Sequence, residues 1–289
     1  KGMKLGVMSF NTEYTIRADD LARAAEERGF DSVWFPEHTH IPSIRTTDFP
    51  GGGTLPKEYA HMSDPFISCM SAAGATTHLK VGTGVSLIPQ HEPIALAKTV
   101  ATLDRLSNGR FLFGIGAGWN VEEMENHGVA YSNRWKVLEE HLKAMKLLWT
   151  EEEASFDGDY VKFDKVWSYP KPLTQPHPPI ILGTFGSKWG RQRVAEIGDG
   201  WIPIGLFHED MMADIEDLNQ RLVALGREPD SVEITIFDVY ETCEEDLKKY
   251  ADLGLCARAV PRCPTEDKDS VLRWLDKYAE IGHRIGAID

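Results

Sequence analysis

Glu37 and His38 are the neighbouring residues best suited to proton transfer in this sequence, and they stand at the end of a short apolar run, residues 32–37. An imidazole gains and loses its proton near neutral pH, so it serves as a general acid or base when a substrate lies beside it. We therefore expect His38 to carry a catalytic proton, with Glu37 as its acidic neighbour.

The same segment permits a second interpretation, because Glu37-His38-x-His40 contains the His-x-His pattern of metal-dependent barrel hydrolases. A catalytic metal site needs further ligands from other strand ends to complete its coordination. The predicted strands at residues 180–183 and 201–204 end without a histidine or a carboxylate. The proton-transfer interpretation is therefore favoured, no metal is expected, and a hydrolase remains a remote alternative.

Three predicted strands lead into glycine-rich segments, at residues 82–86, 114–119 and 183–187. Glycine lets a flat ligand approach the backbone and lets amides turn toward a phosphate. One such cluster could simply make a tight turn, whereas three at one end of a fold favour a ligand site. The segment Gly186-Ser187, followed by Lys188 and Arg191 at the start of a helix, is the expected phosphate site.

The pattern Gly114-x-Gly116-x-Gly118 does not match the dinucleotide fingerprint, because Trp119 occupies the place of its third glycine. The pattern also lies in the middle of the chain. We therefore expect no nicotinamide site of the Rossmann type.

Elements of strand and helix type alternate along the chain and would position these residues. The clearest helix has Trp135, Leu138, Leu142, Met145 and Leu148 on one apolar stripe. The strands are expected at residues 5–10, 32–37, 81–88, 110–115, 180–183, 201–204, 233–239 and 257–260. Helices are expected at 16–28, from 64–65 onward, at 92–109 and 135–148, at 191–197, up to 226, and at 244–253 and 271–281.

Strict alternation indicates a parallel sheet, since each parallel neighbour needs a crossover helix. About eight units predict a single (β/α)8 barrel over residues 1–289, with an open doubly wound sheet as the alternative. Barrel enzymes carry their active site at the carboxyl ends of the strands. Two insertions, residues 39–63 and a hairpin with a proline-rich return at 155–179, are expected to border that mouth.

The net charge of −14 opposes general binding to nucleic acid or to an anionic membrane. The expected partner is a small-molecule substrate. Cys69, Cys243, Cys256 and Cys263 are scattered and are expected to be reduced thiols of a cytoplasmic protein, although a Cys256–Cys263 disulfide stays open. No signal-peptide core or membrane-spanning run is expected.

The sequence resembles the bacterial luciferase-like superfamily of flavin and deazaflavin oxidoreductases, over essentially the whole chain. The branch it looks most like is assigned the deazaflavin coenzyme F420, with flavin mononucleotide (FMN) as the alternative. The resemblance rests on Gly29-Phe30-Asp31-Ser32-Val33-Trp34, Glu37-His38, Leu55-Pro56-x-x-Tyr59-Ala60, Asp64-Pro65-Phe66, Gly82-Thr83-Gly84-Val85, Ala97-Lys98, Ala101 to Ser107, Gly109-Arg110-Phe111, Gly114-x-Gly116-Ala117-Gly118-Trp119, Pro170-Lys171-Pro172 and Asp199-Gly200-Trp201.

The resemblance implies a site in which the cofactor ring lies in the barrel mouth. A non-prolyl cis peptide, matched here by Gly84-Val85, would lie behind the ring, and the pair Glu37 and His38 would lie near its reactive face. The implied cofactor-binding residues are Met8, Gly84, Val85, Gly116, Ala117, Gly118, Gly183, Thr184, Gly186 and Ser187.

One position departs from the sugar-phosphate dehydrogenases of the superfamily, which carry a carboxylate just past the glycines of the fourth strand. Trp119 stands there in this chain, on the expected substrate side. Alcohol oxidation of that type is therefore doubtful, and the aromatic surface suits a flatter or more apolar substrate.

The expected function is hydride transfer between F420 and an organic substrate, in a direction left open, with His38 supplying or taking a proton. An FMN-dependent monooxygenase is the main alternative, and a cofactor-binding protein without activity is a remote one. The resemblance also implies a homodimer. An anionic cofactor fits the acidic chain only if Lys188, Arg191 and Arg193 gather near the phosphate.

Overall fold

A computed structural model describes residues 2–204, 208–238 and 243–289. Its main sheet consists of parallel strands in the order β1-β12-β11-β10-β9-β6-β4-β3-β2, with β5 paired to β6. These strands are β1 (Lys4–Leu5), β2 (Val7–Met8), β3 (Ser32–Phe35), β4 (Lys80–Thr83), β5 (Ser86–Leu87), β6 (Phe111–Gly116), β9 (Ile180–Phe185), β10 (Gly200–Ile204), β11 (Glu233–Asp238) and β12 (Arg258–Pro261).

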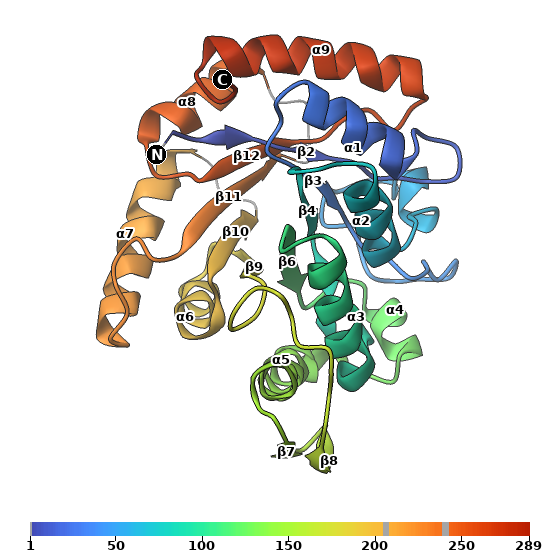
Figure 1. Ribbon diagram of the computed structural model, residues 1–289, viewed down its shortest axis with the longest axis vertical. Coiled ribbons are helices and arrows are strands. Elements are labelled where there is room, and N and C mark those ends of the chain that lie inside the picture. The colour runs from blue at the N-terminus through green and yellow to red at the C-terminus, as the bar shows by residue number, and fades with distance from the viewer. Residues whose placement is uncertain (1, 205–207, 239–242) are drawn as a thin grey trace.

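The sheet closes on itself through the first segment of the chain. β1 pairs with β12 and β2 pairs with β3, with only Gly6 between the two strands. A Cβ at Gly6 would lie 2.6 Å from Ser32 Oγ, so this junction requires glycine. The predicted barrel is confirmed and the open sheet is wrong (Figure 1).

Helices between the strands surround the barrel, as Figure 1 shows. The predicted start of α2 is confirmed, because the Asp64 side chain accepts a hydrogen bond from Ile67 N and Pro65 opens the helix. The short helix α4 was not predicted. The helices are α1 (Ala18–Glu27), α2 (Pro65–Gly74), α3 (Pro93–Leu106), α4 (Val121–Asn126), α5 (Arg134–Thr150), α6 (Lys188–Ile197), α7 (His208–Ala224), α8 (Glu244–Leu253) and α9 (Lys268–Arg284), with 3₁₀ turns η1 (Lys57–Ala60), η2 (Ile88–Gln90) and η3 (Tyr131–Asn133).

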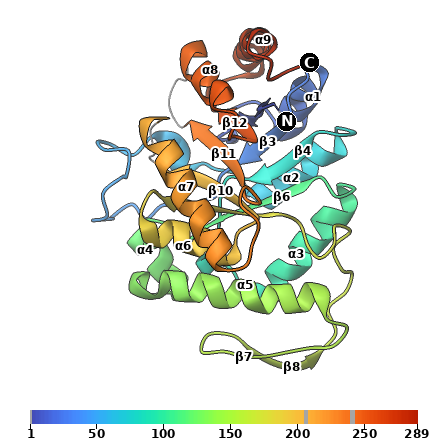
Figure 2. The ribbon, with the colours of Figure 1, turned by 90° about the vertical axis from the view of Figure 1, so that its left-hand side faces the viewer.

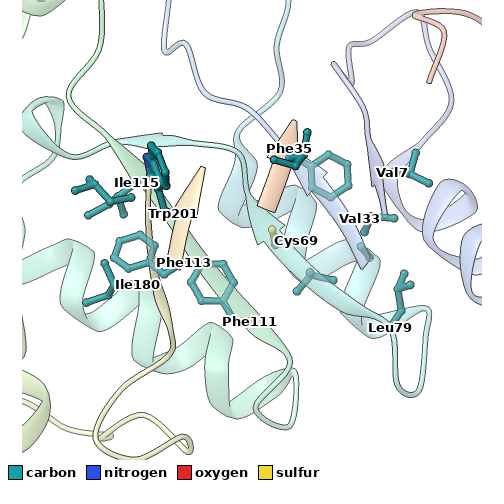
Figure 3. Close-up of a cluster of buried hydrophobic side chains, with 14 of the residues drawn as sticks. Val7, Val33, Phe35, Cys69, Leu79, Phe111, Phe113, Ile115, Ile180 and Trp201 are labelled. Carbon is teal, nitrogen blue, oxygen red and sulfur yellow. The ribbon is translucent and has the colours of Figure 1, made fainter. Parts of the chain in front are cut away.

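Side chains alternate along each strand between the helices and the barrel interior. On β6, Phe111, Phe113 and Ile115 pack in the layer beneath the helices, together with Val33 of β3 and Trp201 of β10 (Figure 3). The intervening positions face a second, smaller cluster inside the barrel. That cluster contains the buried side chains of Met8, Phe10, Trp34, Tyr59, Leu112, Ile181, Ile202 and Val260.

The paired glycines of β4 and β6 face this interior, because residues two apart share one face of a strand. A Cβ at Gly82 would lie 2.5 Å from the Trp34 ring, and one at Gly84 would lie 2.7 Å from Phe237. A Cβ at Gly114 would lie 1.9 Å from the Thr83 carbonyl oxygen. Protein atoms therefore already require these three glycines, and the prediction that the clusters primarily serve a ligand needs correction here.

The insertion at residues 155–179 lies on the outside of the barrel. β7 (Ala154–Asp157) and β8 (Lys162–Val166) form the predicted hairpin, which lies along α5 (Figure 2). The Glu140 carboxylate of α5 accepts hydrogen bonds from the amides of Asp159 and Tyr160 at the hairpin turn.

The proline-rich return runs along the opposite end of the barrel from the mouth. Lys171 Nζ donates to the carbonyls of Leu148 and Glu151 at the end of α5, and Thr174 N donates to Asp104 near the end of α3. The expectation that this insertion borders the mouth is therefore wrong, since a segment that follows a helix enters the next strand at its amino end.

The four cysteines form no disulfide, so the open Cys256–Cys263 pairing does not occur. Among the described residues, none of the helices is long and apolar enough to cross a membrane.

The packing of Gly114 predicts a large effect of one methyl group. Gly114→Ala should lower the free energy of unfolding by about 1–3 kcal/mol or more, because backbone must move to admit the Cβ. Gly74→Ala is the matched control, since nothing lies within 4 Å of a Cβ there and the residue is helical. That control should be neutral or stabilising, by up to about 1 kcal/mol. Equal urea midpoints for the two variants would refute the packing account.

Candidate functional site

The barrel mouth is closed on one side by the loop at residues 39–63. Phe49 and Tyr59 of this loop lie with ring centroids 5.1 Å apart, and Tyr59 meets Phe10 edge to face at 5.4 Å. Ile41, Leu55 and Met62 of the same loop pack on the interior cluster. The expectation that this insertion borders the mouth is therefore confirmed by its contacts.

His38 lies at the centre of these contacts, and its ring is fixed by a carboxylate that the sequence reading missed. Its Nδ1 lies 2.8 Å from Oε2 and 2.9 Å from Oε1 of Glu123 on α4. The exposed fractions of the two side chains are 7% and 0%. Because an ionised carboxylate only accepts hydrogen bonds, His38 donates its Nδ1 proton, and Nε2 on the far edge of the ring is left for other partners.

Aromatic rings surround the rest of the His38 side chain. Its ring centroid lies 5.5 Å from that of Tyr59 and 5.6 Å from that of Trp119. Phe49 completes the group, with its centroid 5.9 Å from Trp119. Trp119 thus lies beside His38 at the mouth, and its placement on the substrate side stays a prediction.

Hydrogen bonds attach α4 to the loop that follows β3. Glu122 accepts from the hydroxyls of Thr46 and Thr47, and the Asn126 amide donates to His40 Nε2 at 2.9 Å. The hydrogen bond from the Thr47 hydroxyl and that from the Thr46 amide lower the pKa of Glu122 to about 2. These contacts hold Glu123 in register with His38.

His40 does not share a site with His38. Its Nδ1 lies 2.9 Å from Thr39 Oγ1, and its Nε2 is taken by Asn126. Within residues 2–204, 208–238 and 243–289, no three His, Cys, Asp or Glu side chains converge in a way that could hold a metal ion. The geometry therefore does not favour the hydrolase alternative.

Glu37 is buried behind the mouth, with an exposed fraction of 3%, and its carboxylate is already used. Oε1 accepts from Leu87 N at 2.8 Å and from Ser86 Oγ at 3.1 Å, and it lies 2.7 Å from His91 Nε2. Glu37 therefore fixes the segment that follows Gly84-Val85, whose peptide bond is cis. These contacts suit a positioning role rather than the expected catalytic one.

His91 is the histidine partner of Glu37, with its Nε2 2.7 Å from Oε1. Burial acts to lower the pKa of His91, but the hydrogen bond and charge of Glu37, assisted by Asp64, outweigh it and raise the pKa above its ordinary value. The contact with the buried carboxylate therefore stabilises the protonated form of His91 relative to a free imidazole.

The expected phosphate site at the end of β9 has one well-formed element. Ser187 is the N-cap of α6, and its Oγ accepts from Gly190 N at 3.1 Å. Thr184 is buried, and its Oγ1 accepts from Trp201 Nε1 at 2.9 Å, so this hydroxyl serves the core. The remaining amides of the first helical turn have no partner within the helix.

The cations expected beside the phosphate are mostly engaged elsewhere. Arg191 donates to Asp214 and Asp217 of α7 at 2.9 and 2.5 Å, although it also contacts the Gly186 carbonyl. Arg193 pairs with Glu139 of α5 at 3.5 Å, and Lys188 Nζ lies over the Trp189 ring. The condition that all three cations gather near the phosphate is therefore not met, because Arg193 pairs with Glu139 and the charge of Arg191 is balanced by two aspartates.

The remaining cofactor-binding candidates lie in or near the mouth. Met8 belongs to the interior cluster, Val85 packs against it, and Gly183 would place a Cβ 3.4 Å from Val85. Gly116 and Ala117 are buried, and Gly118 has a φ of +90°, which favours glycine.

Glu123 carried a weak signal in the sequence. Asn120 accepts a hydrogen bond from Glu123 N at 3.2 Å, which is the N-cap contact of α4. The Asn-x-x-Glu spacing of a capped helix could have revealed this element. Nothing in the sequence pairs Glu123 with His38, which lies 85 residues away.

Comparisons with known proteins agree with this architecture. The family model for luciferase-like monooxygenases matches residues 3–252. A crystal structure of the monooxygenase RslO1 from Streptomyces bottropensis is similar in fold, with a TM-score of 0.77, 20% identity, and coverage of 96% of this chain and 98% of that one.

Three relatives show the range of the family. An uncharacterised protein of Mycobacterium tuberculosis is 36% identical over 280 residues, covering 96% of this chain and 98% of the relative. An FMNH2-dependent dimethylsulfone monooxygenase of Pseudomonas fluorescens is 28% identical, covering 79% of this chain and 58% of the relative. An F420-dependent glucose-6-phosphate dehydrogenase of Amycolatopsis mediterranei is 29% identical, covering 81% of this chain and 63% of the relative.

The match over residues 3–252 and the 36% identity along nearly the full chain lead to one conclusion. This chain belongs to the luciferase-like monooxygenase family, a family of oxidoreductases with both F420-dependent and FMN-dependent members.

Proposed function

We propose that this protein transfers a hydride between coenzyme F420 and an apolar organic substrate, with His38 as the proton donor or acceptor. The observation that carries the proposal is the buried pair of His38 and Glu123 at the barrel mouth. The pair sets one ring nitrogen against a carboxylate and leaves the other for a reacting group.

The mouth fits a flat cofactor ring. Val85, Trp119, Ile204 and Phe237 are half-buried apolar side chains packed on the interior cluster, so they offer a surface for a planar system. A Cβ at Gly116 would lie 2.8 Å from Val85, so glycine at this position keeps a further side chain off the apolar surface. When bound there, the deazaflavin would supply a ring carbon that gives or takes a hydride.

The start of α6 would hold the cofactor phosphate. The amides of Lys188 and Trp189 belong to the first helical turn, where unpaired N–H groups favour an anion. The charge of Arg191 is balanced by two aspartates, so its part is to hold the Gly186 carbonyl. Binding would therefore depend on amides and Lys188 more than on a cluster of arginines.

His38 would complete the reaction with a proton. When the substrate is reduced, Nε2–H donates a proton to the atom that becomes a hydroxyl or a carbon–hydrogen bond, and Nδ1–H stays with Glu123. When the substrate is oxidised, Nε2 takes the proton and Glu123 stabilises the imidazolium that forms. Glu123 thus acts through His38 as a positioning residue.

The substrate would be apolar, because the side chains around His38 are aromatic. Tyr59, Phe49 and Trp119 line the side where a substrate would reach the ring. Trp119 stands where the resemblance to sugar-phosphate dehydrogenases would place a carboxylate, and the carboxylate of Glu123 is bound to His38. An enone, a quinone or an aldehyde fits this surface better than a sugar phosphate.

An FMN-dependent monooxygenase is the second candidate. It is supported by the similarity to the dimethylsulfone monooxygenase of Pseudomonas fluorescens, and the same apolar bed suits both ring systems.

Cofactor titration separates the two candidates. Fluorescence titration of the purified protein with F420 and with FMN should give saturable binding of F420 with at least tenfold weaker FMN binding. Tight binding of FMN together with no binding of F420 would contradict the F420 proposal and favour the monooxygenase.

Two substitutions test the proton role. His38→Ala should lower kcat by about 10²–10⁴-fold with an acceptor drawn from a panel of enones, quinones and aldehydes, because general acid catalysis is lost. Glu123→Gln should lower kcat by a smaller factor and move its pH profile. The F420 dissociation constant should stay within about threefold in both variants; wild-type turnover by His38→Ala would exclude the role of His38.

The contact between His91 and Glu37 predicts a pH-dependent stability. Because the folded-state pKa of His91 lies above 6.5, the contact contributes fully below about pH 6.5 and its contribution is lost as the pH rises through the folded-state value. The difference in unfolding free energy between wild type and His91→Gln should therefore shrink as the pH rises above about 6.5. In a Glu37→Gln background this pH dependence should disappear, whereas its persistence there would contradict the assigned partner.

A further inference from the structure

Phe49 belongs to the group of aromatic rings that surrounds His38. Its ring centroid lies 5.1 Å from that of Tyr59 and 5.9 Å from that of Trp119. These are the two rings that flank His38, at 5.5 and 5.6 Å. The side chain of His38 is only 7% exposed. A substrate can therefore reach the imidazole only if a neighbouring side chain moves aside.

Two of the three aromatic rings are attached to regular structure. Tyr59 is buried on η1, where the adjacent Glu58 forms an ion pair with Arg262, just after β12. Trp119 is followed directly by Asn120, the buried N-cap residue of α4. Moving either ring out of the mouth therefore requires the end of a helical element to shift.

Phe49 is half-buried, and the chain that follows it can change conformation. Residues 50–54, Pro-Gly-Gly-Gly-Thr, are all exposed. Gly52 and Gly53 have φ values of +78° and +71°, and nothing lies within 4 Å of a Cβ at either position. Glycine has access to both negative and positive φ, and no packing selects between them here. Phe49 is therefore the ring of the group that moves at the lowest cost.

The segments on either side of residues 48–54 are fixed, so that this movement is local. Before them, the carboxylate of Glu122 on α4 accepts hydrogen bonds from the hydroxyls of Thr46 and Thr47. After them, Leu55 packs on the interior cluster and η1 follows. Phe49 can therefore turn away from Trp119 while both ends of the loop keep their contacts.

We propose that Phe49 is a gate on the path of the substrate to His38, and that its side chain sets the size of the substrate that passes. In this structure its ring completes the aromatic group. A turn about residues 50–54 separates it from Trp119 and opens the way to the imidazole, as short loops do in many enzymes. The size limit rests on the proposed function of His38, whereas the gate itself does not.

Chemical modification of His38 tests the gate without any cofactor. Diethyl pyrocarbonate acylates accessible, unprotonated imidazoles, and tandem mass spectrometry gives the rate for each histidine separately. Phe49→Ala should raise the rate at His38 about fivefold or more, and Phe49→Leu should give an intermediate rate. The rate at His78, whose side chain is 77% exposed, should stay unchanged and is the internal reference.

Leu55→Ala is the matched control, because it shortens another apolar side chain of the same loop that packs on the interior cluster. It should change the rate at His38 by less than about twofold. Thermal melting checks that each variant is folded. An unchanged rate at His38 in folded Phe49→Ala and Phe49→Leu, or an equal rise in Leu55→Ala, would overturn the gate.

The size limit is tested with F420 and a series of enones that carry substituents of increasing size. Phe49→Ala should raise kcat/KM for the largest acceptors relative to the smallest by about tenfold or more, since space at a substrate site is worth this much discrimination. Turnover with an unchanged size preference would refute the size limit alone. If no acceptor is turned over, the proposed function fails and the size limit with it, while the modification rates still decide the gate.

Discussion

The hydrogen bond between His38 and Glu123 is the interaction on which the mouth depends. It joins the end of β3 to α4 across 85 residues of chain, and it leaves neither side chain open to water. Removing one partner of a buried hydrogen bond costs about 1–3 kcal/mol, because the other partner is left unsatisfied. The hydrogen bonds of Glu122 and Asn126 to the same loop attach α4 there and support this contact.

The carboxylate of Glu37 likewise fixes a neighbouring segment, on the other side of β3. Glu37 holds Ser86 and Leu87, and its Oε1 also contacts His91. Glu37 and His38, which are adjacent in the sequence, therefore have different partners and different roles. Glu37 fixes the segment that follows Gly84-Val85, and His38 contacts Glu123 and the aromatic rings of Tyr59 and Trp119.

The sequence predicted the barrel and most of its elements because their signals are local. Asp64-Pro65 and the stripe from Trp135 to Leu148 each encode a helix within one or two turns. The glycines at 82, 84 and 114 were harder to interpret, since the bulk that excludes a side chain comes from Trp34, Phe237 and the Thr83 carbonyl. The partners of His38 and Arg191 were beyond prediction for the same reason: Glu123 and the aspartates of α7 are distant in sequence.

The central claim is that the ring of His38 is held by Glu123 and faces a bound cofactor. Nitrogen-15 NMR of the histidine rings, with and without saturating F420, tests it directly. The account predicts a proton on Nδ1 of His38 in both states and a shift of Nε2 on binding. An unprotonated Nδ1, or a His38 ring unaffected by F420 that is demonstrably bound, would contradict it.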